Sequence, residues 1–259
     1  MKKVFLSIIA LSTMLSFGSF VQAASSTMQS DLSERLRVEK EGFIKDISTQ
    51  NAEGLINTAD LISGSGLSDK DLYAAVENRI NEKHQDFLSN PKNDTVAKEI
   101  NALMRALASI DPKAGDFIQK MDESTSRGIR ERAVRLLPKL YWFGQRNALM
   151  QRTDFYEPGQ NLMTYRLMNL IASDDPLMRR YGSEEINRRN GAEPIIYKKM
   201  AERLEKDRTV VNNSGAIAID AYSWFCRILR DYDRQNSQPI LSSIVNDPAI
   251  NSKIKKYAR

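Results

Sequence analysis

Residues 94–112 read DTVAKEINALMRALASIDP, and the spacing of apolar residues in this stretch indicates the fold. From Ile100 to Ile110 the apolar positions recur at intervals of three and four, which places them on one face of an α-helix. Asp111-Pro112 then supplies a capping residue and a proline suited to the first turn of the next helix. The same spacing recurs along the chain, and strand-like alternation over five or more residues is hard to find. The sequence therefore predicts an all-α protein.

Helix boundaries are marked mainly by capping residues that precede prolines. These pairs are Asn90-Pro91, Asp111-Pro112, Asp175-Pro176, Glu193-Pro194 and Asp247-Pro248. Ser68 marks another start, Asn190-Gly191 marks a stop, and the adjacent acids Glu184 and Glu185 are interpreted as first-turn charges. We expect helices at about 29–48, 51–62, 68–89, 94–109, 112–122, 126–151, 158–172, 175–190, 194–206, 214–234, 239–246 and 248–258. Their short turns favour antiparallel pairs.

Three segments of the chain look alike, at 108–112, 171–176 and 244–248. Each ends one helix and starts the next at an Asp-Pro pair, and the latter two are followed by basic residues and a tyrosine. Over about residues 90–258 this pattern resembles HEAT-like repeats. The resemblance implies stacked antiparallel helical hairpins, an α-solenoid, in at least the C-terminal half. A second explanation stays open, because Asp-Pro is a favourable helix start and recurs wherever helices begin.

The composition is that of an ordinary globular protein of 259 residues, 41% hydrophobic and 27% charged. The apolar content argues against a disordered chain, and the 12 glycines are too few for a collagen-like one. A single cysteine cannot form an intramolecular disulfide, and with a single histidine it argues against a zinc or iron–sulfur site. No cofactor is expected.

The first 23 residues have the features of a cleaved signal peptide. Lys2 and Lys3 precede an apolar run over 4–21, and small residues before and at Ala23 form a cleavage site. Serines and a glycine dilute the run, which argues against a membrane anchor, and no later segment is apolar enough to cross a membrane. We therefore expect export to the periplasm of a Gram-negative bacterium, or secretion as the alternative. Nucleic acid is not an expected ligand in either compartment.

The two parts of the mature chain differ in charge. Residues 24–123 hold 12 basic and 18 acidic side chains, a net charge of −6, whereas residues 124–259 hold 24 and 15, a net charge of +9. Seventeen of the 21 arginines and thirteen of the 17 aromatic residues of 24–259 also lie in the second part. The sequence therefore predicts an acidic N-terminal helical region over 24–123 and a basic, aromatic-rich helical repeat region over 124–259.

No catalytic group of residues is evident. His84 has polar neighbours and is expected at the surface, and Cys226 in an apolar helix is expected to be a buried, unreactive thiol. The glycines at 64 and 66 lack the lysine and preceding strand of a phosphate loop, so residues 64–66 are interpreted as a flexible turn. Glu123-Ser124 resembles the Glu-Ser of lytic transglycosylases as a dipeptide alone. We expect a protein that is not an enzyme, with a degenerate lytic enzyme as the least favoured alternative.

The stretch 126–151 supplies the candidate binding surface. Its candidate residues are Arg132, Arg135, Lys139, Trp142, Phe143 and Arg146. The last four share one helical face, and the first two extend it if Pro138 does not break the helix. Arginine and aromatic side chains dominate the energy of many recognition surfaces. Packing of Trp142 and Phe143 on the next hairpin is the alternative, because an inner helix of a two-layer stack is apolar on two sides.

These observations favour a non-enzymatic interaction or scaffold protein of the periplasm whose basic C-terminal half binds an acidic partner protein. The acidic N-terminal half would bind a second client or shield the basic surface. The alternative partner is an anionic envelope component, such as peptidoglycan or the phosphates of lipopolysaccharide and lipid headgroups.

Overall fold

The structure is a computed structural model that describes residues 4–122 and 126–259, with side chains at 27–121, 126–212 and 214–259. Within these residues the regular secondary structure is helical and no strand is found, which confirms the all-α prediction. The α-helices are α1 (Val4–Thr49), α2 (Ala52–Ser65), α3 (Lys70–Ser89), α4 (Asp94–Ile110), α5 (Gly115–Asp122), α6 (Arg127–Leu136), α7 (Leu140–Met150), α8 (Leu162–Ala172), α9 (Pro176–Arg188), α10 (Pro194–Asp207), α11 (Gly215–Tyr232), α12 (Arg234–Asn246) and α13 (Ser252–Ala258). Short 3-10 turns precede α5, α7 and α11.

Capping explains where several helices begin. Pro176 starts α9 as predicted, because the Asp175 carboxylate accepts a hydrogen bond from the Leu177 backbone N–H at 2.8 Å. The predicted start of the last helix at Asp247-Pro248 is wrong. Asp247 caps a turn there, and α13 begins four residues later behind Asn251.

The predicted flexible turn at residues 64–66 is also wrong. Gly64 and Ser65 are the buried last residues of α2, and Gly66 ends that helix in the left-handed conformation, with a φ of 74°. Glycine is favoured there because a side chain would crowd the backbone at positive φ. The first helix differs as well, since α1 extends from Val4 to Thr49 without a break instead of starting near residue 29.

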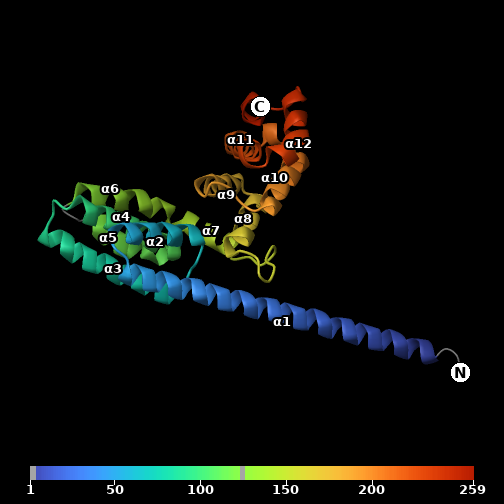
Figure 1. Cartoon of the computed structure of the whole chain (residues 1–259), viewed down its shortest axis with the longest axis horizontal. Helices are drawn as coiled ribbons and strands as arrows, with labels where there is room; N and C mark the ends of the chain where they lie inside the picture. Colours follow the sequence, from blue (N-terminus) through green and yellow to red (C-terminus); the bar gives the residue numbers. More distant parts are fainter. Residues whose placement is uncertain (1–3, 123–125) are drawn as a thin grey trace.

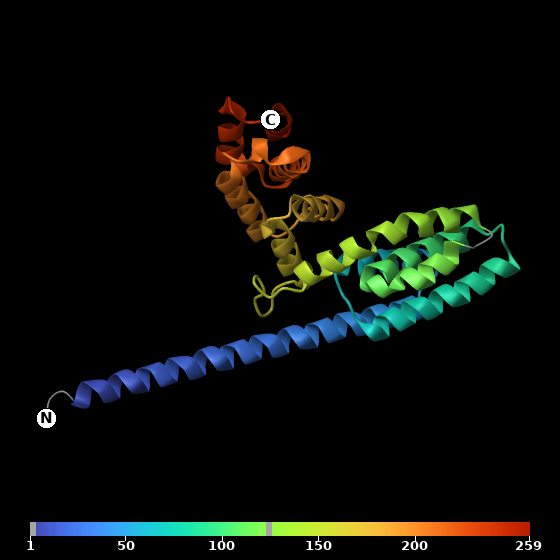
Figure 2. The ribbon, with the colours of Figure 1, turned by 180° about the vertical axis from the view of Figure 1, so that it is seen from behind.

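The helices form two lobes (Figures 1 and 2). The N-terminal lobe contains α2 to α7 and the C-terminal part of α1, and the C-terminal lobe contains α8 to α13. One hydrophobic cluster of buried residues spans Ile47 to Phe143, a second spans Met150 to Ala258, and the half-buried Trp142 packs against both. The predicted division at residues 123 and 124 is one of charge, whereas the packing divides later, at α7.

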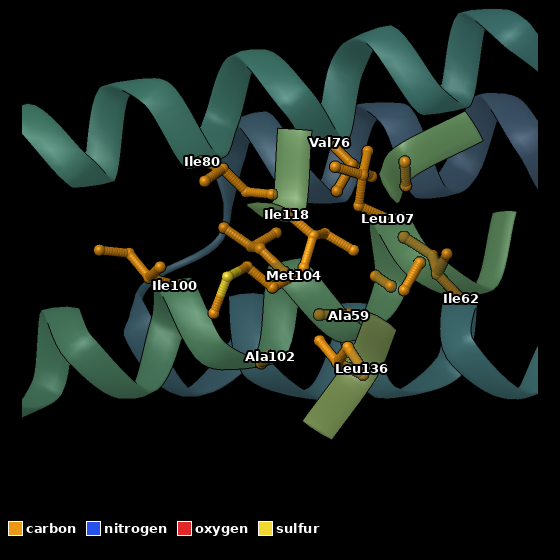
Figure 3. Packing of buried hydrophobic residues seen from close by; sticks show 14 of the residues in the cluster. Ala59, Ile62, Val76, Ile80, Ile100, Ala102, Met104, Leu107, Ile118 and Leu136 are labelled. Carbon is orange, nitrogen blue, oxygen red and sulfur yellow. The ribbon is translucent and has the colours of Figure 1, made fainter. Parts of the chain in front are cut away.

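The N-terminal lobe is held together by aliphatic side chains, as Figure 3 shows. Helix α4 lies at its centre and contacts α2, α3, α6 and α7. Leu103, Met104 and Leu107 of α4 are fully buried, together with Ile62 of α2 and Ile80 of α3. The helical spacing that predicted 94–109 is therefore the spacing of side chains that face this core.

The C-terminal lobe has two rows of helices. Helices α8, α10 and α12 contact one another in that order, and so do α9, α11 and α13. Ion pairs join neighbouring helix pairs: Arg203 of α10 pairs with Asp174 at 2.7 Å, and Arg208 pairs with Asp247 at 2.9 Å. The Arg203 guanidinium lowers the pKa of the Asp174 carboxyl.

Helix α1 contacts both lobes. Its Leu32 packs with Tyr156 and Tyr165, which belong to the loop before α8 and to α8 itself. Its Glu39 carboxylate accepts two hydrogen bonds from the Arg166 guanidinium, at 2.9 and 2.7 Å. Arg166 is 1% exposed and the Glu39 side chain is 22% exposed, so this ion pair is a largely buried link between the lobes.

Candidate binding cleft between the lobes

The six predicted binding residues lie in different environments. Arg132, Arg135 and Lys139 are exposed, Trp142 is half-buried, and Phe143 and Arg146 are buried. Pro138 separates the two groups, because it lies in a 3-10 turn over Leu137–Lys139 between α6 and α7. Proline has no N–H to continue the helical hydrogen bonds, so residues 126–151 form two helices instead of the predicted one.

Arg146 does not contribute to an exposed surface, because it fills the junction between the lobes. Its guanidinium donates hydrogen bonds to the Ser63 carbonyl oxygen at 2.8 Å and to the Tyr181 hydroxyl at 3.1 Å. It also donates to the Asn147 side-chain oxygen at 2.7 Å. Ser63 lies in the last turn of α2 and Tyr181 lies in α9, so one side chain links helices of both lobes.

Three aromatic rings surround this guanidinium. Its central carbon lies 5.6 Å from the ring centre of Trp142, 5.0 Å from that of Phe143 and 5.4 Å from that of Tyr181. Negative ring faces stabilise a cation at such distances, more strongly where water is excluded. Phe143 and Arg146 are therefore buried at the junction, and the interpretation of Trp142 and Phe143 as packing residues agrees with their surroundings.

An open cavity lies beside this junction, lined by residues of α2 and of the end of α9. It has a volume of about 300 Å³ and is lined by Asn57, Asp60, Leu61, Arg188 and Arg189. We call it the inter-lobe cleft. The first three residues are spaced at i, i+3 and i+4 on α2 and therefore share one helical face.

A glycine brings the walls of the cleft together. A Cβ atom at Gly64 would lie 3.2 Å from Arg188 Nη2 and 3.4 Å from Glu185 Oε2. Because glycine has no side chain, the last turn of α2 can approach the charged end of α9 this closely.

The charges around the cleft are mostly positive. Arg105 of α4 pairs with Asp60, and Arg188 and Arg189 both contact Glu185. Burial lowers the pKa of Arg105, and the positive charges of Arg132 and Arg188 lower it further, which places both of them within electrostatic reach of Arg105. These four arginines, together with the carboxylates of Asp60 and Glu185, carry a net charge of +2 (4 − 2).

Among these residues the sequence predicted Arg132 alone. Arg105 lies in the acidic half of the chain, and Arg188-Arg189 were assigned to the end of a helix without a role. Glu185 was interpreted as a first-turn charge, which is wrong, since it lies in the last turns of α9 and is 4% exposed. An adjacent pair of arginines next to a helix stop was the signal present in the sequence.

His84 and Cys226, the other residues considered for chemistry, do not line the cleft. His84 is half-exposed, and Cys226 is buried, with burial raising the pKa of its thiol to about 12. Glu123 and Ser124, the candidate lytic residues, lie outside the described residues.

The described part of the chain contains no group of three or more His, Cys, Asp or Glu side chains placed to hold a metal ion. It also contains no helix with the length and apolarity needed to span a membrane. Comparison with known proteins gives no relative: no protein-family model matches the chain, and no curated protein matches its sequence.

Proposed function

We propose that this chain is a non-enzymatic interaction protein that binds an acidic partner protein at the inter-lobe cleft. The observation that supports it best is the excess of positive charge at the cleft: Arg188 and Arg189 line it, Arg105 pairs with its Asp60, and Arg132 lies within electrostatic reach of Arg105. Arginine forks bind carboxylates through paired hydrogen bonds, and a net positive cleft attracts acidic partners. This position replaces the face over 132–146 that the sequence predicted.

The exposed basic residues of α6 extend the proposed surface. Arg132 and Arg135 are exposed, and Lys139 follows them in the turn before α7. Within the described residues Arg132 and Lys139 form no ion pair, so their charges are available to a partner. Exposed charges of this kind increase the rate of association and make binding sensitive to salt.

We also propose that the C-terminal lobe is a HEAT-like stack of three helical hairpins, α8–α9, α10–α11 and α12–α13. The contacts between alternate helices support it. Two ion pairs support it too. Asp174, in the turn between α8 and α9, pairs with Arg203 of α10, and Arg208, just after α10, pairs with Asp247, just after α12, so each pair joins neighbouring hairpins. A stack of this type presents an extended binding surface to a partner.

The proposal also includes export and cleavage after Ala23, so that the protein acts in the periplasm. The N-terminal part of α1 extends away from both lobes in the two views (Figures 1 and 2). The contacts of Leu32 and Glu39 with the C-terminal lobe lie beyond the proposed cleavage site and would remain in the mature protein.

The test is affinity purification of the tagged protein from a crosslinked periplasmic extract. Arg132→Gln/Arg189→Gln removes two positive charges and brings the net charge of the cleft to zero. Lys92→Gln/Lys98→Gln removes two charges from exposed lysines elsewhere in the N-terminal lobe and serves as the matched control. We expect an acidic protein that is captured by the wild type and by the control and is lost in the cleft variant. Capture should also be lost in 0.5 M salt, because the screening length falls from about 8 Å at 0.15 M salt to about 3 Å at 1 M. Equal capture by both variants would contradict the proposed site, and recovery of envelope polymer in place of protein would favour the anionic-component alternative.

A further inference from the structure

The inter-lobe cleft has an apolar residue among its charged walls. Leu61 is 50% exposed and lines the same cavity as Arg188 and Arg189. Isolated exposed leucines are common on protein surfaces and need no explanation alone. This one lines the cavity together with Arg188 and Arg189, so a ligand that reaches these charges also reaches an apolar contact.

The size of the cavity restricts what can enter it. Its volume is about 300 Å³, and it is open to the surface, so a few side chains of a partner can enter it. An extended segment can place such side chains against Leu61 and the arginines at the same time.

The polar groups of the cleft suit a peptide. The net charge of +2, in which Asp60 and Glu185 are already counted, would be balanced by two carboxylates of the ligand. Arginine side chains bind carboxylates in a planar, bidentate geometry. Asn57 is exposed, and its amide makes no hydrogen bond within the described residues. An asparagine amide both donates and accepts hydrogen bonds, so it can pair with the backbone of an extended segment.

We propose that the cleft recognises an acidic linear segment in which an apolar side chain lies between carboxylates. The apolar side chain packs on Leu61 while the carboxylates bind the arginines. This inference rests on the proposed function and specifies which part of the acidic partner is bound. A phosphate group carries a comparable charge of about −2 but offers nothing to Leu61, so the peptide is the ligand that uses the whole cleft.

Two labelled peptides test the proposal by fluorescence anisotropy with the purified protein. The first, Gly-Asp-Glu-Leu-Glu-Asp-Gly, is blocked at both ends, and the second has serine in place of leucine. We expect the leucine peptide to bind about tenfold more tightly, as partial burial of one leucine side chain implies. In Leu61→Ser this ratio falls to about one while the affinity for the serine peptide stays within about twofold, because the charges are unchanged.

Leu88→Ser is the matched control, because Leu88 is 49% exposed at the end of α3 and lines no part of the cleft. It should keep the full preference for leucine. Equal binding of both peptides by the wild type would overturn the apolar contact and leave the proposed function standing. Displacement of both peptides by inorganic phosphate at equal concentration would overturn it in favour of a phosphate site. Absence of binding by either peptide also overturns the inference, and the affinity purification then decides separately whether the proposed function fails.

Discussion

The two lobes differ in what they bury. Among the described residues of α2 to α6, the buried charged side chain is Glu99 of α4, which pairs with Lys83 at 3.0 Å within a mostly aliphatic core. The junction and the C-terminal lobe bury Arg146, Arg166 and Arg179, at 1%, 1% and 4% exposure. Each of these arginines lies over an aromatic ring.

This difference explains the composition of the second half of the chain. Arginine and aromatic residues are enriched there together, which is typical of a recognition surface. Several of them pair with one another inside the fold, as Arg179 does with Tyr222 at 5.1 Å. The enrichment therefore has two sources: internal cation–π pairs that hold the helices together, and the exposed arginines of the cleft. Substitution of a buried arginine should therefore lower stability, whereas substitution of an exposed one should not.

The largest effect is expected for Arg146→Ala. It removes four hydrogen bonds and contacts with three rings at the junction, and leaves the Ser63 carbonyl and the Asn147 amide oxygen without this donor. We expect the free energy of unfolding to fall by about 3–5 kcal/mol in urea denaturation. The exposed Arg135→Ala should change it by less than about 0.5 kcal/mol. Equal effects of the two substitutions would remove the distinction between internal and surface arginines.

Leu103→Ala probes the aliphatic core of the N-terminal lobe. Leu103 is fully buried in α4, so truncation leaves a cavity and should cost about 3 kcal/mol. Because no charge is involved, the loss should be the same in low and high salt. A loss that changes with salt would mean that this lobe also depends on electrostatic links.

Glu39→Gln probes the link between α1 and the C-terminal lobe. It leaves the buried Arg166 without its carboxylate partner and should cost about 2 kcal/mol. Glu41→Gln is the matched control, because the Glu41 carboxylate is 56% exposed and pairs with Arg37 at the surface. Urea denaturation of both variants is the measurement. Equal losses in the free energy of unfolding would mean that α1 does not hold the lobes together in solution.

Cys226 is expected to give the smallest effect. Burial raises the pKa of its thiol from 9.0 to about 12, so the folded protein keeps the proton at pH values where the unfolded chain loses it. Stability therefore falls as pH rises above about 9, by at most about 1.4 kcal/mol per pH unit. At pH 8 a thiol reagent should label native Cys226 at least about a hundredfold more slowly than the unfolded protein. Rapid native labelling would show an accessible thiol and contradict its burial.

The sequence predicts the fold class and the main helices because both depend on local patterns. Apolar spacing located α4, and the pair Asp175-Pro176 located the start of α9. The cleft was not predictable in the same way, because Leu61 and Arg105 of the first half meet Arg188 and Arg189 of the second through tertiary packing. Nothing in the sequence around Arg146 distinguishes a buried guanidinium from an exposed one.

The most direct test of the account measures stability and capture on one variant, Arg132→Gln/Arg189→Gln. We expect its free energy of unfolding to stay within about 1 kcal/mol of the wild type, because Arg132 forms no ion pair within the described residues and the buried Glu185 keeps its closer partner Arg188, while the acidic partner is no longer captured. A folded variant that still captures the partner would contradict the proposed cleft, and an unfolded variant would contradict the separation of structural from binding arginines.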